Sequence, residues 1–299
     1  MARSQHLCET PEQSEHVNRI GVTAPNLSGA FGGPGIFADW VPSDAALWTE
    51  RPHPARIADL LLGGKDHFRA DRAAVERLTT VEPALPLAAR ARRQFVERAM
   101  RYVAGKVQGL LVVGAGLPTA PPIHELVQLK EPQGRVVYVD DDPIVLAHLR
   151  ARTACPVAPG HLRKPEALLA APEVRRMLAP GRPVAVLLEV ELELIEDAAD
   201  PQGLVTKLVE ALPSGSFLLL SHATADFAPQ VWDQLIDVYD SFRIRVHPRS
   251  WVEVAGFLDG LELEPPGLEL VSRWRPAPGA SYELSEAAIS RYGVIGRKA

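Results

Sequence analysis

Short apolar runs alternate with amphipathic stretches along the chain from residue 109 to its end. Continuous apolar runs such as Val184-Ala-Val-Leu-Leu188 are typical of strands that are buried on both faces of a parallel sheet. The pattern predicts strands at residues 109–113, 135–139, 155–158, 183–190, 216–220, 267–272 and 292–296. It predicts helices at residues 121–130, 143–152, 165–178, 201–211, 229–240 and 250–259. This alternation is typical of an α/β fold with one doubly wound, seven-stranded sheet whose last two strands form a hairpin.

The sequence before residue 109 has a different pattern and predicts two further segments. Residues 1–50 are polar or glycine-rich with little periodicity, and we interpret them as an arm that is partly disordered or draped on the domain. Residues 51–108 have helical apolar periodicity. We therefore expect an N-terminal helical segment ahead of a Rossmann-like domain at residues 109–299.

Three helices are expected in this N-terminal helical segment. The first has an apolar face from Ile57 to Leu62 and stops at Gly63-Gly64. Asp66 suits the N-cap of a second helix that runs to about residue 78. The third is arginine-rich and amphipathic and runs from Leu87 to Val103.

The stretch from Gly109 to Asp142 carries the clearest functional signal. A predicted strand ends at Gly114-Ala-Gly116, a short helical segment follows, and the next predicted strand ends on Asp140. Doubly wound folds hold nucleotide-type cofactors in this way, because glycines let the backbone approach the ligand and the acid accepts hydrogen bonds from ribose hydroxyls. The sequence therefore predicts a nucleotide-type ligand at this turn.

The composition narrows the class of partner. A net charge of −5 provides no basic field for nucleic acid or for anionic lipid. No apolar stretch approaches the roughly 20 residues that span a bilayer. The two cysteines, Cys8 and Cys155, form no disulfide framework, so we expect a cytoplasmic protein with a small-molecule substrate. The oligomeric state stays open, and a homo-oligomer is compatible with the sequence.

Three segments together resemble the actinobacterial S-adenosyl methyltransferase family, and the likeness covers roughly residues 52–298. They are Pro54-Ala-Arg-Ile-Ala-Asp-Leu-Leu-Leu-Gly-Gly-Lys-Asp-His-Phe68, Gly114-x-Gly-Leu-Pro-Thr119 with His124-Glu125, and Val137-Tyr-Val-Asp-x-Asp-Pro-x-Val-Leu146. The resemblance implies a class I methyltransferase fold that binds S-adenosylmethionine across the carboxyl ends of its first strands. It also implies that the N-terminal helical segment covers the site, which would keep the reactive methyl group from bulk water.

The resemblance assigns cofactor-binding roles to residues of all three segments. The candidates are Gly114, Ala115 and Gly116 at the turn, Asp140 and Asp141 at the ribose, His161 near the adenine, and Lys65 and Asp66 in the cover.

The chain departs from the family pattern at the cofactor and substrate pocket. Val112 stands where the family has an acid that would orient the ammonium end of the cofactor, and His161 replaces an Asp near the adenine. Pro122 and Ile123 replace an Asn and a Thr, and Glu193 replaces a His near the end of the fourth strand. The loss of several charge-assisted hydrogen bonds, worth roughly 1.5–3 kcal/mol each, would weaken cofactor binding.

Three glutamates near the end of the fourth strand are candidates for chemistry. Glu189, Glu191 and Glu193 alternate along the chain, so in a strand they would all point to one face. If the strand has already left the sheet at residue 189, all three are solvated. Alternatively, Glu191 and Glu193 lie at the mouth of the site as a general base or as anchors for a cation, because neighbouring carboxylates raise one another's pKa. A metal site is the least supported alternative, because no His or Cys stands nearby at ligand spacing.

His222 follows the fifth strand, where substrates are contacted in this fold, and Asp226 lies close in sequence. His222 is a candidate general base that Asp226 orients, and the alternative is a histidine that only stabilises its loop. A hydrolase triad of Ser221, His222 and Asp226 is disfavoured, because residues adjacent in sequence rarely adopt that geometry and the nucleophile-elbow motif is missing. Four aromatic residues are candidate walls of an apolar substrate pocket, with ordinary core packing as the alternative, namely Trp232, Tyr239, Phe242 and Trp251.

Three functions follow from these observations. The first is methyl transfer from S-adenosylmethionine to a small molecule, as in specialised metabolism. The second retains the fold but replaces methyl transfer by an acid–base reaction such as cyclisation, isomerisation or elimination. The third is a binding protein without turnover. The glycine turn and Asp140 favour the first function, whereas the changes at Val112, His161 and Glu193 favour the other two.

Overall fold

The computed structural model describes residues 47–128, 134–179, 181–276 and 285–299, all within one compact unit, Ala45–Ala299. The predicted arm, residues 1–50, lies outside these ranges except for a short helix, α1 (Leu47–Glu50). The strands are β1 (Gly109–Val113), β2 (Arg135–Asp140), β3 (Val157–Pro159), β4 (Val184–Leu188), β5 (Phe217–Ala223), β6 (Leu261–Leu263), β7 (Glu269–Leu270) and β8 (Arg291–Lys298).

These strands form a single sheet in the order β3-β2-β1-β4-β5-β8-β6, and β7 also pairs with β8. The pairs from β3 to β5 are parallel, whereas β8 runs antiparallel to β5, β6 and β7. Strand order reverses next to β1, which places the switch point of the sheet beside the glycine turn. The predicted doubly wound α/β fold is confirmed, and so is the antiparallel pairing of the last two predicted strands.

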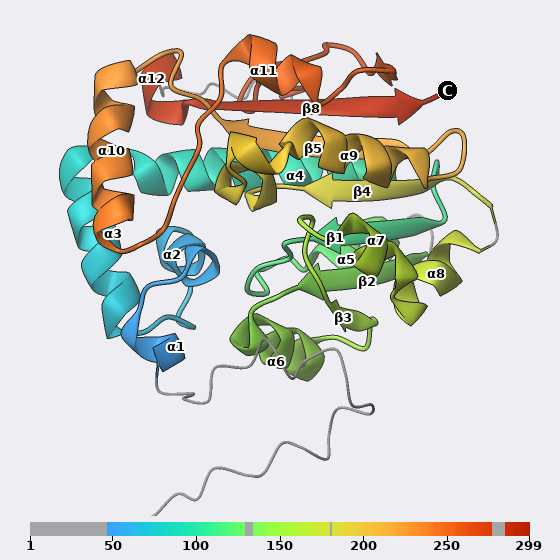
Figure 1. The fold of residues 1–299 in the computed structure, drawn as a ribbon, viewed down its shortest axis with the longest axis horizontal. Coiled ribbons are helices and arrows are strands. Elements are labelled where there is room, and N and C mark those ends of the chain that lie inside the picture. Colours follow the sequence, from blue (N-terminus) through green and yellow to red (C-terminus); the bar gives the residue numbers. More distant parts are fainter. Residues whose placement is uncertain (1–46, 129–133, 180, 277–284) are drawn as a thin grey trace, which may run out of the picture. The chain divides into compact units, whose positions relative to one another are not determined.

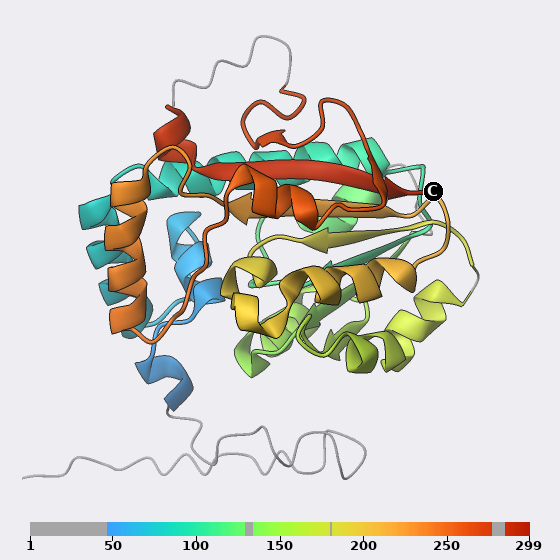
Figure 2. The same ribbon diagram turned by 45° about the horizontal axis from the view of Figure 1, so that its top comes forward.

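Helices cover both faces of the sheet (Figures 1 and 2). They are α2 (Pro54–Leu61), α3 (Arg69–Val81), α4 (Leu85–Val103), α5 (Ile123–Gln128), α6 (Pro143–Arg152), α7 (Pro165–Ala170), α8 (Pro172–Leu178), α9 (Pro201–Glu210), α10 (Pro229–Ser241), α11 (Trp251–Gly256) and α12 (Glu286–Ile289). Helix α4 packs with α5 and α12 on one face, and α7 packs with α9 on the other. Among the described residues, no helix is long and apolar enough to cross a membrane.

The strands form because their side chains are apolar on both faces. Every residue of β1, β4 and β5 is buried, as expected for central strands of a sheet that is covered on both sides. A second, smaller hydrophobic cluster lies beyond the carboxyl ends of these strands, where Ile57, Leu78 and Leu235 bring α2, α3 and α10 together. In Figure 1 these three helices lie at the end of the sheet toward which β4 and β5 point.

Several predicted element boundaries are wrong. Strand β4 ends at Leu188 instead of residue 190, and the chain continues as a 3₁₀ helix, η2 (Glu191–Leu194). The predicted helix at residues 165–178 is split at Pro172, because proline cannot donate the backbone hydrogen bond that would continue α7. The short edge strand β6 was not predicted, because its exposed Leu-Glu-Leu sequence has no buried run.

The prediction that Asp66 caps α3 is also wrong. The N-cap residue is Phe68, and the carboxylate of Asp71 in the first turn accepts the Phe68 N–H at 2.7 Å. The backbone N–H of Asp66 instead donates to the side chain of Asp59 in α2 at 2.9 Å. Asp66 therefore belongs to a folded loop between α2 and α3, ahead of the helix.

Candidate cofactor site

The glycine turn after β1 has the backbone conformation that its sequence predicts. Gly114 and Gly116 have φ angles of 64° and 65°, in the left-handed region that glycine adopts without strain. The N–H of Ala115 donates to the carbonyl of Val139 at 3.1 Å, so the turn is held against β2. A Cβ added at Gly116 would meet no atom within 4 Å, so the space beside this residue is open. A ligand can therefore approach the backbone of the turn at Gly116 without an intervening side chain.

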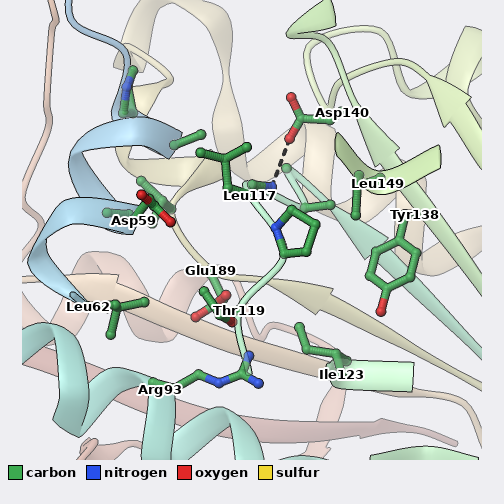
Figure 3. A pocket seen from close by; sticks show the side chains of 18 of the residues that line it. Asp59, Leu62, Arg93, Leu117, Thr119, Ile123, Tyr138, Asp140, Leu149 and Glu189 are labelled. Atoms are coloured by element: carbon green, nitrogen blue, oxygen red, sulfur yellow. Dashed lines mark hydrogen bonds between the residues drawn. The ribbon is translucent and has the colours of Figure 1, made fainter. Parts of the chain in front are cut away.

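Asp140, at the end of β2, faces this turn (Figure 3). One oxygen of its carboxylate, Oδ2, accepts the N–H of Gly116 at 2.9 Å, and Oδ1 accepts the N–H of Asp142 at 2.9 Å. Burial raises the pKa of Asp140 to about 7, although both hydrogen bonds favour the ionised form. Each oxygen keeps a further lone pair, so the carboxylate can brace the turn and still accept from a ligand hydroxyl.

A cavity of about 450 Å³ opens above the glycine turn. Its floor is formed by the ends of β1, β2 and β4, and α2 forms one wall, with Asp59 and Leu62 facing the cavity in Figure 3. Its acidic lining residues are Asp59, Asp140, Asp141, Glu189 and Glu191, and its basic lining residues are Arg92, Arg93 and Arg152. Five of the predicted cofactor residues therefore line one cavity, namely Gly114, Ala115, Gly116, Asp140 and Asp141.

Helix α2 is held in place by a buried arginine. The Nε of Arg56 lies 3.0 Å from Oδ2 of Asp71 in α3, and its Nη1 lies 3.4 Å from Oδ2 of Asp142, two residues after Asp140. Buried ion pairs of this kind depend on good geometry, because each ion has lost its hydration. Arg56 therefore fixes the position of α2 relative to the end of β2 and to the cavity.

The Gly63-Gly64 pair after α2 has a steric explanation. Gly63 has a φ of 83°, and a Cβ at Gly64 would lie 1.9 Å from Oδ1 of Asp59. The carboxylate of Asp59 occupies this space and accepts the N–H of Asp66, with His67 Nδ1 at 3.2 Å from Oδ2. The Leu-Gly-Gly-Lys-Asp-His string therefore forms a compact loop around Asp59 at the cavity wall.

Glu191 lies between the glycine turn and the loop after β3. Its Oε1 accepts the N–H of Leu162 at 2.9 Å, and its Oε2 would lie 2.6 Å from a Cβ at Gly114. Burial raises the pKa of Glu191 to about 7. This glutamate is neither in a strand nor solvated, and its raised pKa matches the requirement for an acid or base near neutral pH.

Glu193 has a different environment, on the other side of η2. It forms a buried ion pair with Arg291 of β8, and its Oε1 also accepts the N–H of Ala223 at 3.0 Å. Burial alone would raise the pKa of Glu193, but the charge and the hydrogen bonds of Arg291, together with weaker effects of His222 and Arg92, hold that pKa below its usual value. A carboxylate held in this way is a poor proton acceptor, and Glu193 does not line the 450 Å³ cavity.

His222 is buried in β5, and both of its ring nitrogens have partners. Nδ1 lies 2.8 Å from the carbonyl oxygen of Ala223, and Nε2 lies 3.1 Å from Nη1 of Arg249. Burial lowers the pKa of His222 to about 4. Asp226 instead accepts hydrogen bonds from the N–H of Trp251 at 2.8 Å and from the hydroxyl of Tyr292 at 2.9 Å. The structure therefore places neither residue at the cavity.

The other predicted cofactor residues lie near the cavity but do not line it. Lys65 is exposed. Asp66 pairs with Arg152 at 2.6 Å, which joins the α2–α3 loop to α6. The Nδ1 of His161 accepts the N–H of Arg163 at 3.1 Å and so stabilises the loop after β3. Among the residues that the structure describes, no group of three or more His, Cys, Asp or Glu side chains is placed to hold a metal ion.

Sequence reasoning did not select several residues that line the cavity. Arg92 and Arg93 come from α4, Asp59 comes from α2, and Glu189 was considered only together with its two neighbours. Glu189 lies 3.5 Å from Nε of Arg92. The signal for Arg92 was weak, because an arginine in an arginine-rich amphipathic helix is most often on a solvated face.

The cavity suits S-adenosylmethionine, which carries a positive sulfonium and an ammonium group. Five acidic side chains line it, the glycine turn exposes backbone groups, and the carboxylate of Asp140 lies beside the turn. Val112 is buried in the core of β1, opposite Tyr138 and Leu187, so it offers no group to the ligand. The acidic wall formed by Glu189 and Glu191 lies on the neighbouring strand end instead.

The strand order, the antiparallel β8 and the glycine turn at the switch point define a class I methyltransferase fold. Residues 42–299 match the family model described as S-adenosyl methyltransferase, and the chain belongs to this family. A comparison with curated proteins finds no match.

Two solved structures are similar over most of their length. A protein of the DUF574 family from Streptomyces avermitilis is 36% identical, with a TM-score of 0.81 over 84% of this chain and 99% of that one. A candidate methyltransferase from Thermobifida fusca is 32% identical, with a TM-score of 0.79 over 87% of this chain and 98% of that one. These likenesses support the resemblance that the sequence showed.

Proposed function

We propose that this protein binds S-adenosylmethionine in the 450 Å³ cavity and transfers its methyl group to a small molecule in the cytoplasm, as in specialised metabolism. The observation that carries the proposal is the glycine turn whose Gly116 N–H is bonded to Asp140 on the floor of an acid-lined cavity. When bound, S-adenosylmethionine supplies an electrophilic methyl group, and its transfer to an O–H leaves neutral S-adenosylhomocysteine and one proton.

Each group of residues has a distinct task in this proposal. Gly114 and Gly116 let the backbone approach the cofactor, and Asp140 accepts from its ribose. The acidic lining favours a cationic ligand, while α2 excludes water from the reacting atoms. Glu189 and Glu191 both line the cavity. We assign Glu189 as the proton acceptor, because Glu191 already accepts the Leu162 N–H and Glu193 is hydrogen-bonded to Arg291, whereas Arg92 lies 3.5 Å from Glu189 without a hydrogen bond.

Calorimetric titration with S-adenosylmethionine and S-adenosylhomocysteine tests this function. We expect low-micromolar dissociation constants for the full chain, and at least tenfold weaker binding by Gly114→Ala. That substitution forces a side chain onto a φ of 64° and against Glu191. The matched control is Gly105→Ala, which has the same kind of strain at a φ of 82° but meets no atom within 4 Å and lies outside the cavity.

One observation favours a second candidate function, an acid–base reaction without methyl transfer. Asp140 and Glu191 both have a pKa raised to about 7 at the same cavity, a combination that suits an acid and a base working near neutral pH. The same titration separates the two functions. Absence of binding at millimolar cofactor would exclude methyl transfer and leave the acid–base reaction.

A further inference from the structure

A second, smaller cavity of about 110 Å³ adjoins the proposed cofactor site. The two cavities share lining residues, among them Ala58, Arg92 and Val190, so they meet along the face between α2, α4 and the end of β4. We propose that this second cavity binds the methyl acceptor, and that the acceptor is a neutral molecule with an aromatic ring and a hydroxyl group. The inference rests on the proposed methyl transfer.

Apolar side chains of three helices, α2, α4 and α10, form the walls of the second cavity. Ile57 and Leu61 of α2, Leu85 and Ala88 of α4, and Trp232 and Leu235 of α10 all line it. Within each helix these positions are three or four residues apart, so each pair lies on one face. Leu61, Leu85 and Trp232 are only partly buried, so the apolar walls remain accessible to a ligand.

The size of this cavity suits one ring. A cavity of about 150 Å³ lined by apolar side chains holds a benzene molecule. The present cavity of about 110 Å³ approaches this volume, and it continues into the larger cavity through the shared lining. A ring between Trp232 and the α2 and α4 stripes would therefore place its polar substituent at the junction of the two cavities.

Arg92 and Glu189 determine which substituent fits the junction. Within the described part of the chain, the buried Nε of Arg92 has no hydrogen-bond partner, and Oε1 of Glu189 lies 3.5 Å away, too far for a good hydrogen bond. A hydroxyl group satisfies both residues, because it accepts from Nε and donates to Oε1. A carboxylate offers no donor to Glu189, and a protonated amine offers no acceptor to Arg92.

The charges around the second cavity disfavour an anionic acceptor. Of its charged lining residues, Glu193 pairs with Arg291 and Arg92 pairs with Glu189. Glu82 is the remaining one, and its Oε1 accepts the N–H of Ala84 at 2.9 Å. The four charged lining residues, two glutamates and two arginines, sum to zero, and Glu189 at the junction adds one negative charge. A carboxylate on the acceptor would therefore be repelled at the junction, whereas a neutral hydroxyl is accommodated.

The same geometry provides a base for the proton that the hydroxyl group of the acceptor loses in the reaction. As a lone pair of the hydroxyl oxygen forms the bond to the methyl carbon, the bond between that carbon and sulfur would break and leave its electron pair on sulfur. The hydroxyl proton would pass to Oε1 of Glu189. Arg92 then faces the ether oxygen and keeps the carboxyl group of Glu189 at the junction. The cofactor loses its positive charge and the carboxylate of Glu189 loses its negative charge, so the net charge of the site is unchanged.

Fluorine NMR titration of the full chain with 4-fluorophenol, 4-fluorobenzoate and fluorobenzene tests the inference. We expect 4-fluorophenol to bind at least tenfold more tightly than either of the other two probes. Ala88→Phe fills the second cavity and should abolish 4-fluorophenol binding, whereas Ala73→Phe, at an exposed position of α3, should leave it unchanged. Arg92→Gln should remove the preference for 4-fluorophenol over fluorobenzene.

Titration of the same samples with S-adenosylhomocysteine separates the two proposals and shows that the variants are folded. Trp232→Leu is a second variant in case Ala88→Phe does not fold, and it should weaken 4-fluorophenol binding by at least fivefold. If S-adenosylhomocysteine binds but 4-fluorophenol does not, or if 4-fluorobenzoate binds as tightly, the acceptor site is wrong and methyl transfer stands. If 4-fluorophenol binds but S-adenosylhomocysteine does not, methyl transfer is wrong and the acceptor role falls with it.

Discussion

Three glutamates that alternate along the chain have three different environments. Glu189 lines the cofactor cavity beside Arg92, Glu191 is bonded to the Leu162 N–H next to Gly114, and Glu193 is paired with Arg291. Their chemistry follows from these neighbours and not from residue type. Burial raises the pKa of Glu191 to about 7, whereas the charge and hydrogen bonds of Arg291 hold the pKa of Glu193 below its usual value despite burial.

At the residue scale, Glu191→Gln is expected to stabilise the protein at high pH. The pKa of Glu191 is raised in the folded protein, so Glu191 ionises less readily there than in the unfolded chain. The free energy of unfolding therefore falls as pH rises from about 4.5 toward about 7. Glutamine keeps an acceptor for the Leu162 N–H but cannot ionise. The variant should therefore be more stable than the natural chain by about 1–3 kcal/mol at pH 8, with little difference at pH 5.

Denaturant unfolding at both pH values measures this difference. The control is Glu125→Gln, at an exposed position of α5, which should change stability by less than about 0.5 kcal/mol at either pH. An equal effect of Glu191→Gln at pH 5 and pH 8 would contradict the assignment of a raised pKa to this residue.

At the scale of elements, the segment after β4 is joined to β8 by one buried ion pair. Glu193 in η2 binds both Arg291 of β8 and the backbone N–H of Ala223 at the end of β5. The single carboxylate therefore holds three elements together at the edge of the second cavity.

Glu193→Gln is accordingly expected to destabilise the fold by about 3–5 kcal/mol, because it leaves the charge of Arg291 buried without its partner. The ion pair is fully formed above the usual carboxyl pKa and is lost only as pH falls through the lowered pKa of Glu193, so the loss should be constant between pH 6 and pH 8. Denaturant unfolding measures it. The double variant Glu193→Leu with Arg291→Met should recover most of the stability.

A catalytic base at Glu193 would give a different result. In that case Glu193→Gln would reduce turnover of an acceptor while leaving the unfolding midpoint where it was. Restored stability of the double variant would instead show that the pair acts through packing and charge.

For the described part of the molecule, the two hydrophobic clusters differ in size and position. The larger one encloses the sheet, and the smaller one joins α2, α3 and α10 beyond the strand ends. Both proposed binding cavities are bounded on one side by α2, which belongs to the smaller cluster. Regions with fewer buried apolar groups open at lower free energy than the main core.

Hydrogen exchange should therefore be faster in α2 and α10 than in β1, β4 and β5. S-adenosylhomocysteine should slow exchange at least fivefold in α2, because this helix forms a wall of the cofactor cavity. Mass spectrometry of peptides from each element measures both effects. Helix α9 serves as the control, because Val205 and Leu208 belong to the larger cluster and no residue of this helix lines either cavity. Equal protection of α2 and β4 without ligand would contradict this division.

The local pattern of the sequence determined most of the strands of the fold, together with the glycine turn and Asp140 of the candidate site. Apolar runs predicted β1, β2, β4, β5 and β8, because strand burial depends on residues that are close in sequence. The glycine turn and Asp140 were predictable for the same reason, since a strand end, a left-handed glycine and the next strand end follow one another along the chain.

The tertiary structure alone decided which charged groups meet. Glu193 and Arg291 are 98 residues apart, and Arg92 reaches Glu189 from a helix that precedes the whole sheet. No periodicity encodes such pairs, because they depend on how helices pack across strand ends. The pKa of each glutamate, the second cavity and the separation of Asp226 from His222 all follow from that packing.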